Sequence, residues 1–137
     1  MNHTIEMKLL HTSHIDVRWG DMDALGHVNN TRYFVYMEQA RVEWLAKVGD
    51  PVDLATNAGP ILANASCTFK KPVVFPARLR IELYPLEIRT RGFNLGYKMF
   101  DTKSDELVAE GQSVIVWVDY KSGKPITLPN DIRQALG

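Results

Sequence analysis

The stretch GDMDALGHVNN, residues 20–30, separates two segments whose apolar residues recur with different periods. Before it, apolar and polar residues alternate from His14 to Trp19, with Ile15, Val17 and Trp19 on one face, which predicts a half-buried strand. After it, apolar residues recur every three or four positions, which predicts an amphipathic helix of about four to five turns. The helical stripe consists of Tyr33, Met37, Ala40, Trp44 and Val48, widened by Phe34 and Leu45.

Both ends of the predicted helix carry suitable capping residues. Asn29 or Asn30 can cap its start, because a short side-chain oxygen can accept from the free N–H groups of the first turn. Gly49, followed by Asp50-Pro51, ends it, since glycine tolerates the left-handed conformation and proline cannot continue a helix. Residues 51–59 are predicted to form a loop.

The rest of the chain consists mainly of strand-like runs separated by turn residues. Four strands are predicted: Ile61–Phe69, Leu79–Tyr84, Leu95–Met99 and Leu107–Val118. Residues 114–118 are apolar on both faces, which indicates a central strand covered on both sides. A short helix is expected from Pro129 to Leu136. This order predicts an α+β fold, with an antiparallel sheet of about five strands wrapped around one long central helix.

The composition is that of one ordinary globular domain. The 137 residues are 45% apolar and 23% charged, enough for a single domain over residues 1–137 with a sizeable core. Basic and acidic residues both number 16, so the charge balance predicts neither nucleic-acid nor membrane binding. The single Cys67 cannot form an internal disulfide, and residues 1–10 lack the order of a signal peptide, so we expect a cytoplasmic protein.

Residues 20–30 also bring together groups that can act on a carbonyl. Asp21, Asp23 and His27 lie in a glycine-hinged loop that leads directly into the helix. The free N–H groups of a first helical turn can hold a carbonyl oxygen as negative charge develops on it. A carboxylate upstream can attack the carbonyl carbon, or remove a proton from water that attacks instead. The pattern therefore suits acyl transfer to water.

The segment DALGHVNN, residues 23–30, with Tyr33 and then Glu38, Ala40 and Arg41, resembles the 4-hydroxybenzoyl-CoA thioesterase-like branch of the hotdog superfamily. Its HVNN motif is especially similar to the corresponding segment of bacterial long-chain acyl-CoA thioesterases and plant acyl-carrier-protein thioesterases. The resemblance extends along nearly the whole chain. It implies a hotdog fold and hydrolysis of a fatty or aromatic acyl-CoA to free acid and CoA. His11 and His14, three residues apart on a strand, would face opposite sides, so no metal site is expected, and no cofactor is expected either.

The resemblance also implies roles for single residues. Asp23 matches the catalytic aspartate, as nucleophile or general base, and the backbone N–H of Asn30 matches the group that polarises the thioester carbonyl. His27 matches a histidine with an active-site role in the plant branch. That branch places an asparagine two residues after its aspartate, where this chain has Leu25, so a plant-type network is not expected.

Contacts to CoA and to a second chain are likewise implied by the resemblance. Arg89, Arg91 and Lys124 fall where relatives place basic residues on the nucleotide phosphates, and arginine pairs with phosphate bidentately. Family members join two sheets edge to edge as homodimers, and many pair again as homotetramers. Their active sites lie at the dimer interface, and we expect the same here.

Several residues near these positions are interpreted as structural. Asp21 is expected to stabilise the loop, Tyr33 and Met37 to belong to the core, and Cys67 to be a core thiol. Lys70 and Lys71 are interpreted as exposed residues at a strand end, and Glu38 with Arg41 as an ion pair or a solvated helix face.

Three alternative functions remain open at the level of sequence. An acyl-carrier-protein thioesterase would favour a broad basic patch, against which zero net charge argues weakly. Dehydratases and hydratases share the hotdog fold but use a different sequence context from residues 23–30. A non-hydrolytic acyl-CoA binder has no need of the carboxylate of Asp23 near the thioester.

Overall fold

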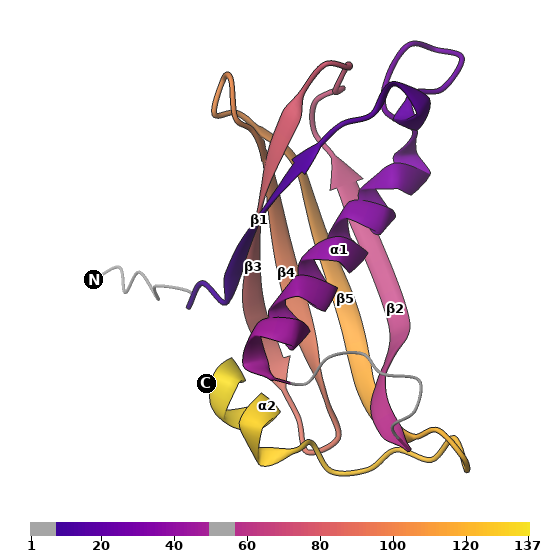
Figure 1. Cartoon of the computed structure of the whole chain (residues 1–137), viewed down its shortest axis with the longest axis vertical. Helices are drawn as coiled ribbons and strands as arrows, with labels where there is room; N and C mark the ends of the chain where they lie inside the picture. The colour runs from indigo at the N-terminus through magenta and orange to yellow at the C-terminus, as the bar shows by residue number, and fades with distance from the viewer. Residues whose placement is uncertain (1–7, 50–56) are drawn as a thin grey trace.

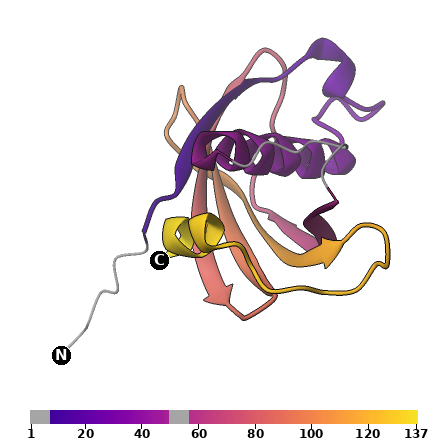
Figure 2. The same ribbon diagram turned by 60° about the horizontal axis from the view of Figure 1, so that its bottom comes forward.

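The computed structural model describes residues 8–49 and 57–137, which form one sheet with a long helix across it. The elements are β1 (His11–Asp16), the short 3-10 turn η1 (Trp19–Asp21), α1 (Asn30–Val48), β2 (Ala58–Phe69), β3 (Arg78–Ile88), β4 (Gly92–Asp101), β5 (Leu107–Asp119) and α2 (Asn130–Leu136). The five strands pair antiparallel in the order β1-β3-β4-β5-β2. Figures 1 and 2 show α1 lying across one face of this curved sheet. The hotdog fold expected from the sequence is confirmed.

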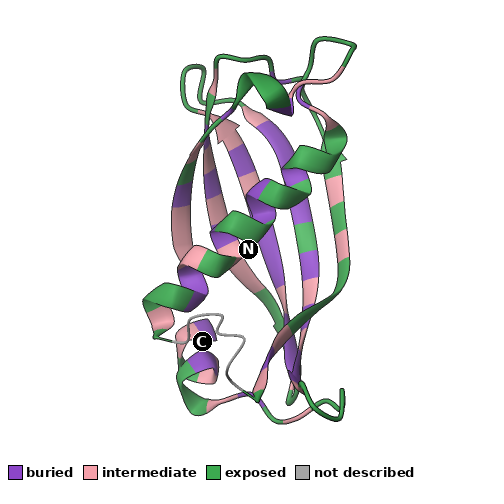
Figure 3. Cartoon of the chain, turned by 45° about the vertical axis from the view of Figure 1, so that its right-hand side comes forward, coloured by how far each residue is buried: buried purple, intermediate pink, exposed green. Residues whose placement is uncertain are grey.

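The core lies between α1 and the sheet face that it covers. Alternate side chains of β3 and β4 point to this face, because successive residues of a strand face opposite sides. Leu79, Ile81 and Leu83 on β3 are therefore buried, while Arg80 and Glu82 between them lie on the outer face. Figure 3 shows the buried residues of the sheet gathered behind α1.

Helix α1 confirms the expected boundaries and most of the expected stripe. Asn29 is the N-cap, and Gly49 closes the helix with φ of 94°, in the left-handed region that favours glycine. The helix buries Tyr33, Tyr36, Met37, Ala40, Trp44 and Leu45. Phe34 was expected to widen the stripe but is exposed. Tyr36 takes that place, because it lies beside Met37 on the same face of the helix.

The strand expected over residues 14–19 is displaced toward the N-terminus. It runs from His11 to Asp16, and Trp19 lies in η1 with 74% of its surface exposed. The strand ends early because the N–H of Arg18 donates to the carboxylate of Asp21 at 3.0 Å, which turns the chain away from the sheet. Alternation alone could not distinguish these outcomes.

The later elements follow the expectations with two differences. Strand β5 does lie inside the sheet, but Val114 and Val116 on its outer face are only half-buried, so the expected cover on both faces is wrong for this chain alone. The loop expected over residues 51–59 falls largely outside the described residues, and Ala58 and Gly59 already belong to β2. The C-terminal helix forms where expected, with Pro129 at its N-cap.

Candidate active site

The loop between η1 and α1 is closed by hydrogen bonds of its own backbone. The N–H of Asp23 donates to the carbonyl of His27 at 2.8 Å, and the N–H of Gly26 donates back to the carbonyl of Asp23 at 3.1 Å. Gly26 has φ of 83°, which the turn requires and which a side chain would strain. The bridge between Met22 and Val28 closes the base of the loop. Asp23 is thereby held at a fixed turn.

The carboxylate of Asp23 retains an oxygen that can act on a substrate. Its Oδ1 accepts from the N–H of Leu25 at 2.9 Å, whereas its Oδ2 has no partner within the described ranges. Leu25 itself is highly exposed, so the turn stands open to solvent. The geometry leaves one carboxylate oxygen available as base or nucleophile.

The first turn of α1 presents one unused donor beside this loop. The side chain of Asn29 accepts from the N–H of Thr31 at 2.9 Å, and the N–H of Arg32 donates to the carbonyl of Asn29 at 2.9 Å. Among the described residues, the N–H of Asn30 donates to no protein acceptor. Partial positive charge at the helix start makes such a group suited to a carbonyl oxygen.

Asp23, His27 and Asn30 line one hollow of about 320 Å³, so the structure brings the three expected catalytic residues together. The ring of Tyr33, buried in the first turn of α1, packs edge-on against Phe69 at the side of this hollow. Burial, followed by the neighbouring Cys67, raises the pKa of the Tyr33 phenol, so the phenol stays protonated at neutral pH.

Sequence reasoning missed two lysines at the same hollow. Lys70 and Lys71 line it, and they pair with Glu110 at 3.8 Å and with Glu106, respectively. They were interpreted only as exposed strand-end residues. The signal that could have found them is the direction of the strand. Because β2 runs back along α1, the residues at the end of β2 lie beside the start of the helix.

Asp21, the other carboxylate of the loop, is buried and fully engaged. One oxygen, Oδ2, accepts from the hydroxyl of Tyr36 at 2.7 Å and from the N–H of Arg18 at 3.0 Å. Its Oδ1 lies 3.7 Å from Nε of Arg32. Burial, followed by the bond to Asp21, raises the pKa of Tyr36. The expected loop-stabilising contacts of Asp21 are present.

The basic residues expected to contact CoA lie at the opposite end of the molecule from the loop with Asp23. Arg89 and Arg91 lie in the turn between β3 and β4, and Lys124 lies in the turn after β5, all at the bottom of Figure 1, whereas the loop with Asp23 is at the top. Arg89 donates to Asn94 at 2.9 Å and lies 3.4 Å from Glu87. Within one chain these residues do not meet Asp23.

A second, apolar cavity lies farther along α1. It measures about 360 Å³ and is lined mainly by side chains of α1, β2, β4 and β5, including Trp44, Leu45, Ile61, Phe93 and Ile115. Glu38 and Arg41 also line it and form no ion pair in the described chain. Glu38 is exposed, so of the two expected arrangements the solvated helix face is the one observed for Glu38. Arg41 instead donates to the hydroxyl of Tyr97 at 3.3 Å.

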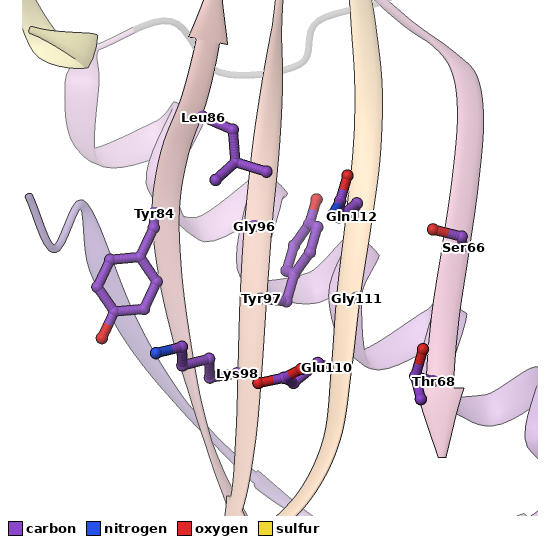
Figure 4. A pocket seen from close by; sticks show the side chains of 10 residues that line it. All are labelled: Ser66, Thr68, Tyr84, Leu86, Gly96, Tyr97, Lys98, Glu110, Gly111 and Gln112. Atoms are coloured by element: carbon purple, nitrogen blue, oxygen red, sulfur yellow. The ribbon is translucent and has the colours of Figure 1, made fainter. Parts of the chain in front are cut away.

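A third hollow, of about 240 Å³, lies on the outer face of the sheet. Figure 4 shows Tyr84, Lys98 and Glu110 among its lining side chains, with α1 behind the sheet. It contains none of the expected site residues. Lys98 lies over the ring of Tyr84, at 5.6 Å from its centroid.

The pKa of Cys67 and the length of the helices bear on two other classes of protein, enzymes with a cysteine nucleophile and proteins with membrane-spanning helices. Burial raises the pKa of the Cys67 thiol to about 11, which fits the expected core thiol better than a nucleophile. None of the helices in residues 8–49 and 57–137 is long and apolar enough to cross a membrane.

Comparison with known proteins places this arrangement in a family. Residues 17–136 match the thioesterase-like superfamily. The solved structure of the PA2801 protein from Pseudomonas aeruginosa superposes with a TM-score of 0.90 at 39% identity, covering 95% of this chain and 100% of that one. The long-chain acyl-CoA thioesterase FadM of Escherichia coli is 26% identical over 124 residues, 89% of this chain and 93% of FadM.

A third relative has an aromatic substrate in its name. The 1,4-dihydroxy-2-naphthoyl-CoA hydrolase of Thermosynechococcus vestitus is 29% identical over 119 residues, which cover 82% of this chain and 80% of the hydrolase. The family match extends over most of the chain, including the loop, α1 and every strand after it. The chain therefore belongs to the thioesterase-like superfamily and is a thioester hydrolase with the hotdog fold.

Proposed function

We propose that this protein hydrolyses acyl-CoA thioesters, with Asp23 as nucleophile or general base and the N–H of Asn30 polarising the carbonyl. The observation that carries the proposal is that the open carboxylate oxygen of Asp23 and the unused N–H of Asn30 belong to residues lining one hollow. The names of FadM and of the naphthoyl-CoA hydrolase support CoA thioesters as the substrate class.

The reaction needs charge stabilisation and one carboxylate. As the carbonyl carbon is attacked, negative charge grows on its oxygen, and the N–H of Asn30 donates to it. If Asp23 attacks, the C–S bond breaks, CoA leaves as thiolate, and water then hydrolyses the mixed anhydride. If Asp23 acts as base, it takes a proton from the attacking water. His27, on the same hollow, can hold a proton for the departing thiolate.

The apolar cavity supports an acyl group of substantial size. Glu38, at its edge, follows Asn30 by eight residues, which places it about 12 Å along the helix from the proposed oxyanion donor. Lining by Trp44, Phe93 and Ile115 suits either a fatty chain or an aromatic ring, since both gain free energy by leaving water. Both classes occur among the relatives.

The edge of the sheet supports a homodimer. Strand β2 is an edge strand of 12 residues without a single charged side chain, and Ile61 and Leu62 on it are exposed. Natural proteins protect such an edge with charge or cover it. Antiparallel pairing of β2 with β2 of a second copy would satisfy its free backbone groups. Two such dimers can pair again as a homotetramer.

This dimer would also complete the CoA site. Antiparallel pairing sets the end of one β2, near Asp23, beside the start of the other, so each loop meets the opposite end of its partner. Arg89, Arg91 and Lys124 lie at that opposite end. The proposed site therefore takes its carboxylate from one chain and its phosphate contacts from the other.

The test is a thiol-release assay on short, medium, long and aromatic acyl-CoAs, with Asp23→Asn in parallel. Asp101→Asn is the matched control, because Asp101 accepts from the N–H two residues ahead at 2.9 Å, as Asp23 does, in a turn without site residues. We expect Asp23→Asn alone to lose activity, by about 100-fold or more. Activity within a few-fold of the parent would reject Asp23, and no release from any ester would reject the substrate class.

A further inference from the structure

Asp21 stands where three parts of the proposed site meet. Its carboxylate oxygen Oδ2 accepts from Arg18, which precedes η1, and from Tyr36, which lies in the second turn of α1. Its backbone carbonyl accepts from the N–H of Asn29, the N-cap of α1, at 2.9 Å. One residue thus ties together the start of the loop, the end of the loop and the body of the helix.

The two carboxylates of the loop are used in opposite ways. Asp21 is 7% exposed and Tyr36 is 4% exposed, so their hydrogen bond is shielded from water. Burying a carboxylate is costly unless its oxygens are hydrogen-bonded, and a fully satisfied pair of this kind holds its surroundings rigid. Asp23, two residues later, is more exposed and keeps a free oxygen. The buried, hydrogen-bonded carboxylate of Asp21 therefore suits a structural role, whereas the carboxylate of Asp23, with its free oxygen, suits a chemical one.

We infer that the Asp21–Tyr36 hydrogen bond is a positioning device that holds the Asp23 carboxylate at the right place relative to the N–H of Asn30. The inference rests on the proposed function of Asp23. Between Asp21 and Asn29 the chain has only the closed turn of residues 22–28, so a shift of Asp21 against α1 moves Asp23 against Asn30. Misplacement of reacting groups by about 1 Å can lower a rate by about 100-fold.

The pair is tested by removing the hydroxyl of Tyr36 alone. Tyr36→Phe keeps the ring in the core, so we expect kcat to fall by about 10- to 100-fold while KM stays within about threefold. Tyr84→Phe is the matched control, because Tyr84 also donates to a carboxylate, that of Glu82, but on the outer face of the sheet. The control should keep kcat within about twofold of the parent.

A second pair of variants separates hydrogen bonding from charge. Both bonds to the Asp21 side chain end on the same oxygen, so the amide oxygen of Asp21→Asn can replace it. We expect Asp21→Asn to keep kcat within about threefold and Asp21→Ala to lose about as much as Tyr36→Phe. The double variant Asp21→Ala with Tyr36→Phe should be no worse than the poorer single variant, because the pair acts as a unit.

The outcomes distinguish this inference from the proposed function. Loss of activity in Asp23→Asn together with unchanged kcat in Tyr36→Phe would overturn the positioning role and leave Asp23 in place. Retained activity in Asp23→Asn would reject the proposed function itself. Thermal unfolding of each variant is measured alongside: a kcat loss that disappears when the assay is run well below Tm would also overturn the positioning role.

Discussion

Tyr33 and Phe69 meet edge to face, with their ring centroids 5.0 Å apart and their planes at 73°. Tyr33 lies in the first turn of α1 and Phe69 is the last residue of β2, so the contact joins two segments far apart in the sequence. Both residues also line the hollow with Asp23. The contact therefore sets one wall of the proposed active site.

Phe69→Leu should weaken this wall. An aromatic pair contributes about 0.5–1.5 kcal/mol beyond its area burial, so we expect a loss of stability of about 1 kcal/mol in urea unfolding and a rise in KM. Phe100→Leu, which removes the ring under Arg80 on the outer face of the sheet, should change stability without changing KM. Equal KM values for parent and Phe69→Leu would contradict a role for this wall in substrate binding.

The turn that holds Asp23 depends on one glycine. Gly26 has φ of 83°, which costs an L-residue with a side chain about 1–2 kcal/mol, so Gly26→Ala should lower stability by that order and reduce kcat. Gly20→Ala, in η1 just before this loop, is the control, because Gly20 has an ordinary φ and nothing lies within 4 Å of an added Cβ. Equal effects of the two variants would show that the conformation of Gly26 is not what matters.

Local pattern was enough to predict α1, because its stripe, its Asn29 cap and its Gly49 end are all encoded in neighbouring residues. The end of β1 was not predictable in this way. Trp19 continues the alternation in sequence, but the carboxylate of Asp21 captures the N–H of Arg18 and ends the strand first. A single side-chain hydrogen bond decided the boundary.

The candidate site shows the same division. Asp23, His27 and Asn30 are close in sequence and were found from one loop motif. Lys70 and Lys71 reach the same hollow only because β2 runs back along α1, a long-range relation that spacing does not reveal. The separation of the β3–β4 turn, which carries Arg89, from the loop that carries Asp23 could likewise be seen only in three dimensions, at opposite ends of Figure 1.

The turn between β3 and β4 should bind the nucleotide part of the substrate. Arg89→Ala combined with Arg91→Ala removes two cations that we propose to contact CoA phosphates, so KM for acyl-CoA should rise by about tenfold or more. KM for a truncated thioester that lacks the nucleotide should stay unchanged. Lys103→Ala, in the exposed turn between β4 and β5 at the opposite end of the sheet from the β3–β4 turn, serves as the control. Equal increases in KM for both substrates would contradict the proposed contact of Arg89 and Arg91 with the CoA phosphates.

Ionisation of Glu43 should make the stability of the fold depend on pH in the acid range. Burial acts to raise the pKa of Glu43, but hydrogen bonds from His11, Gln39 and Ser13 outweigh it and hold that pKa below its usual value. A carboxyl whose pKa is lowered by folding contributes stability above its unfolded pKa of about 4.3, and this contribution is lost as pH falls through the folded value.

The measurement is Tm between about pH 6 and pH 3 for the parent and for Glu43→Gln, which cannot ionise. The parent should lose Tm more steeply below about pH 4.5, since protonation of Glu43 weakens its bonds from His11 and Ser13. Glu38→Gln is the control, because Glu38 is exposed on the same helix and forms no ion pair in the described ranges. Parallel curves for parent and Glu43→Gln would show that Glu43 titrates alike in the folded and unfolded chain, against the hydrogen bonds that surround it.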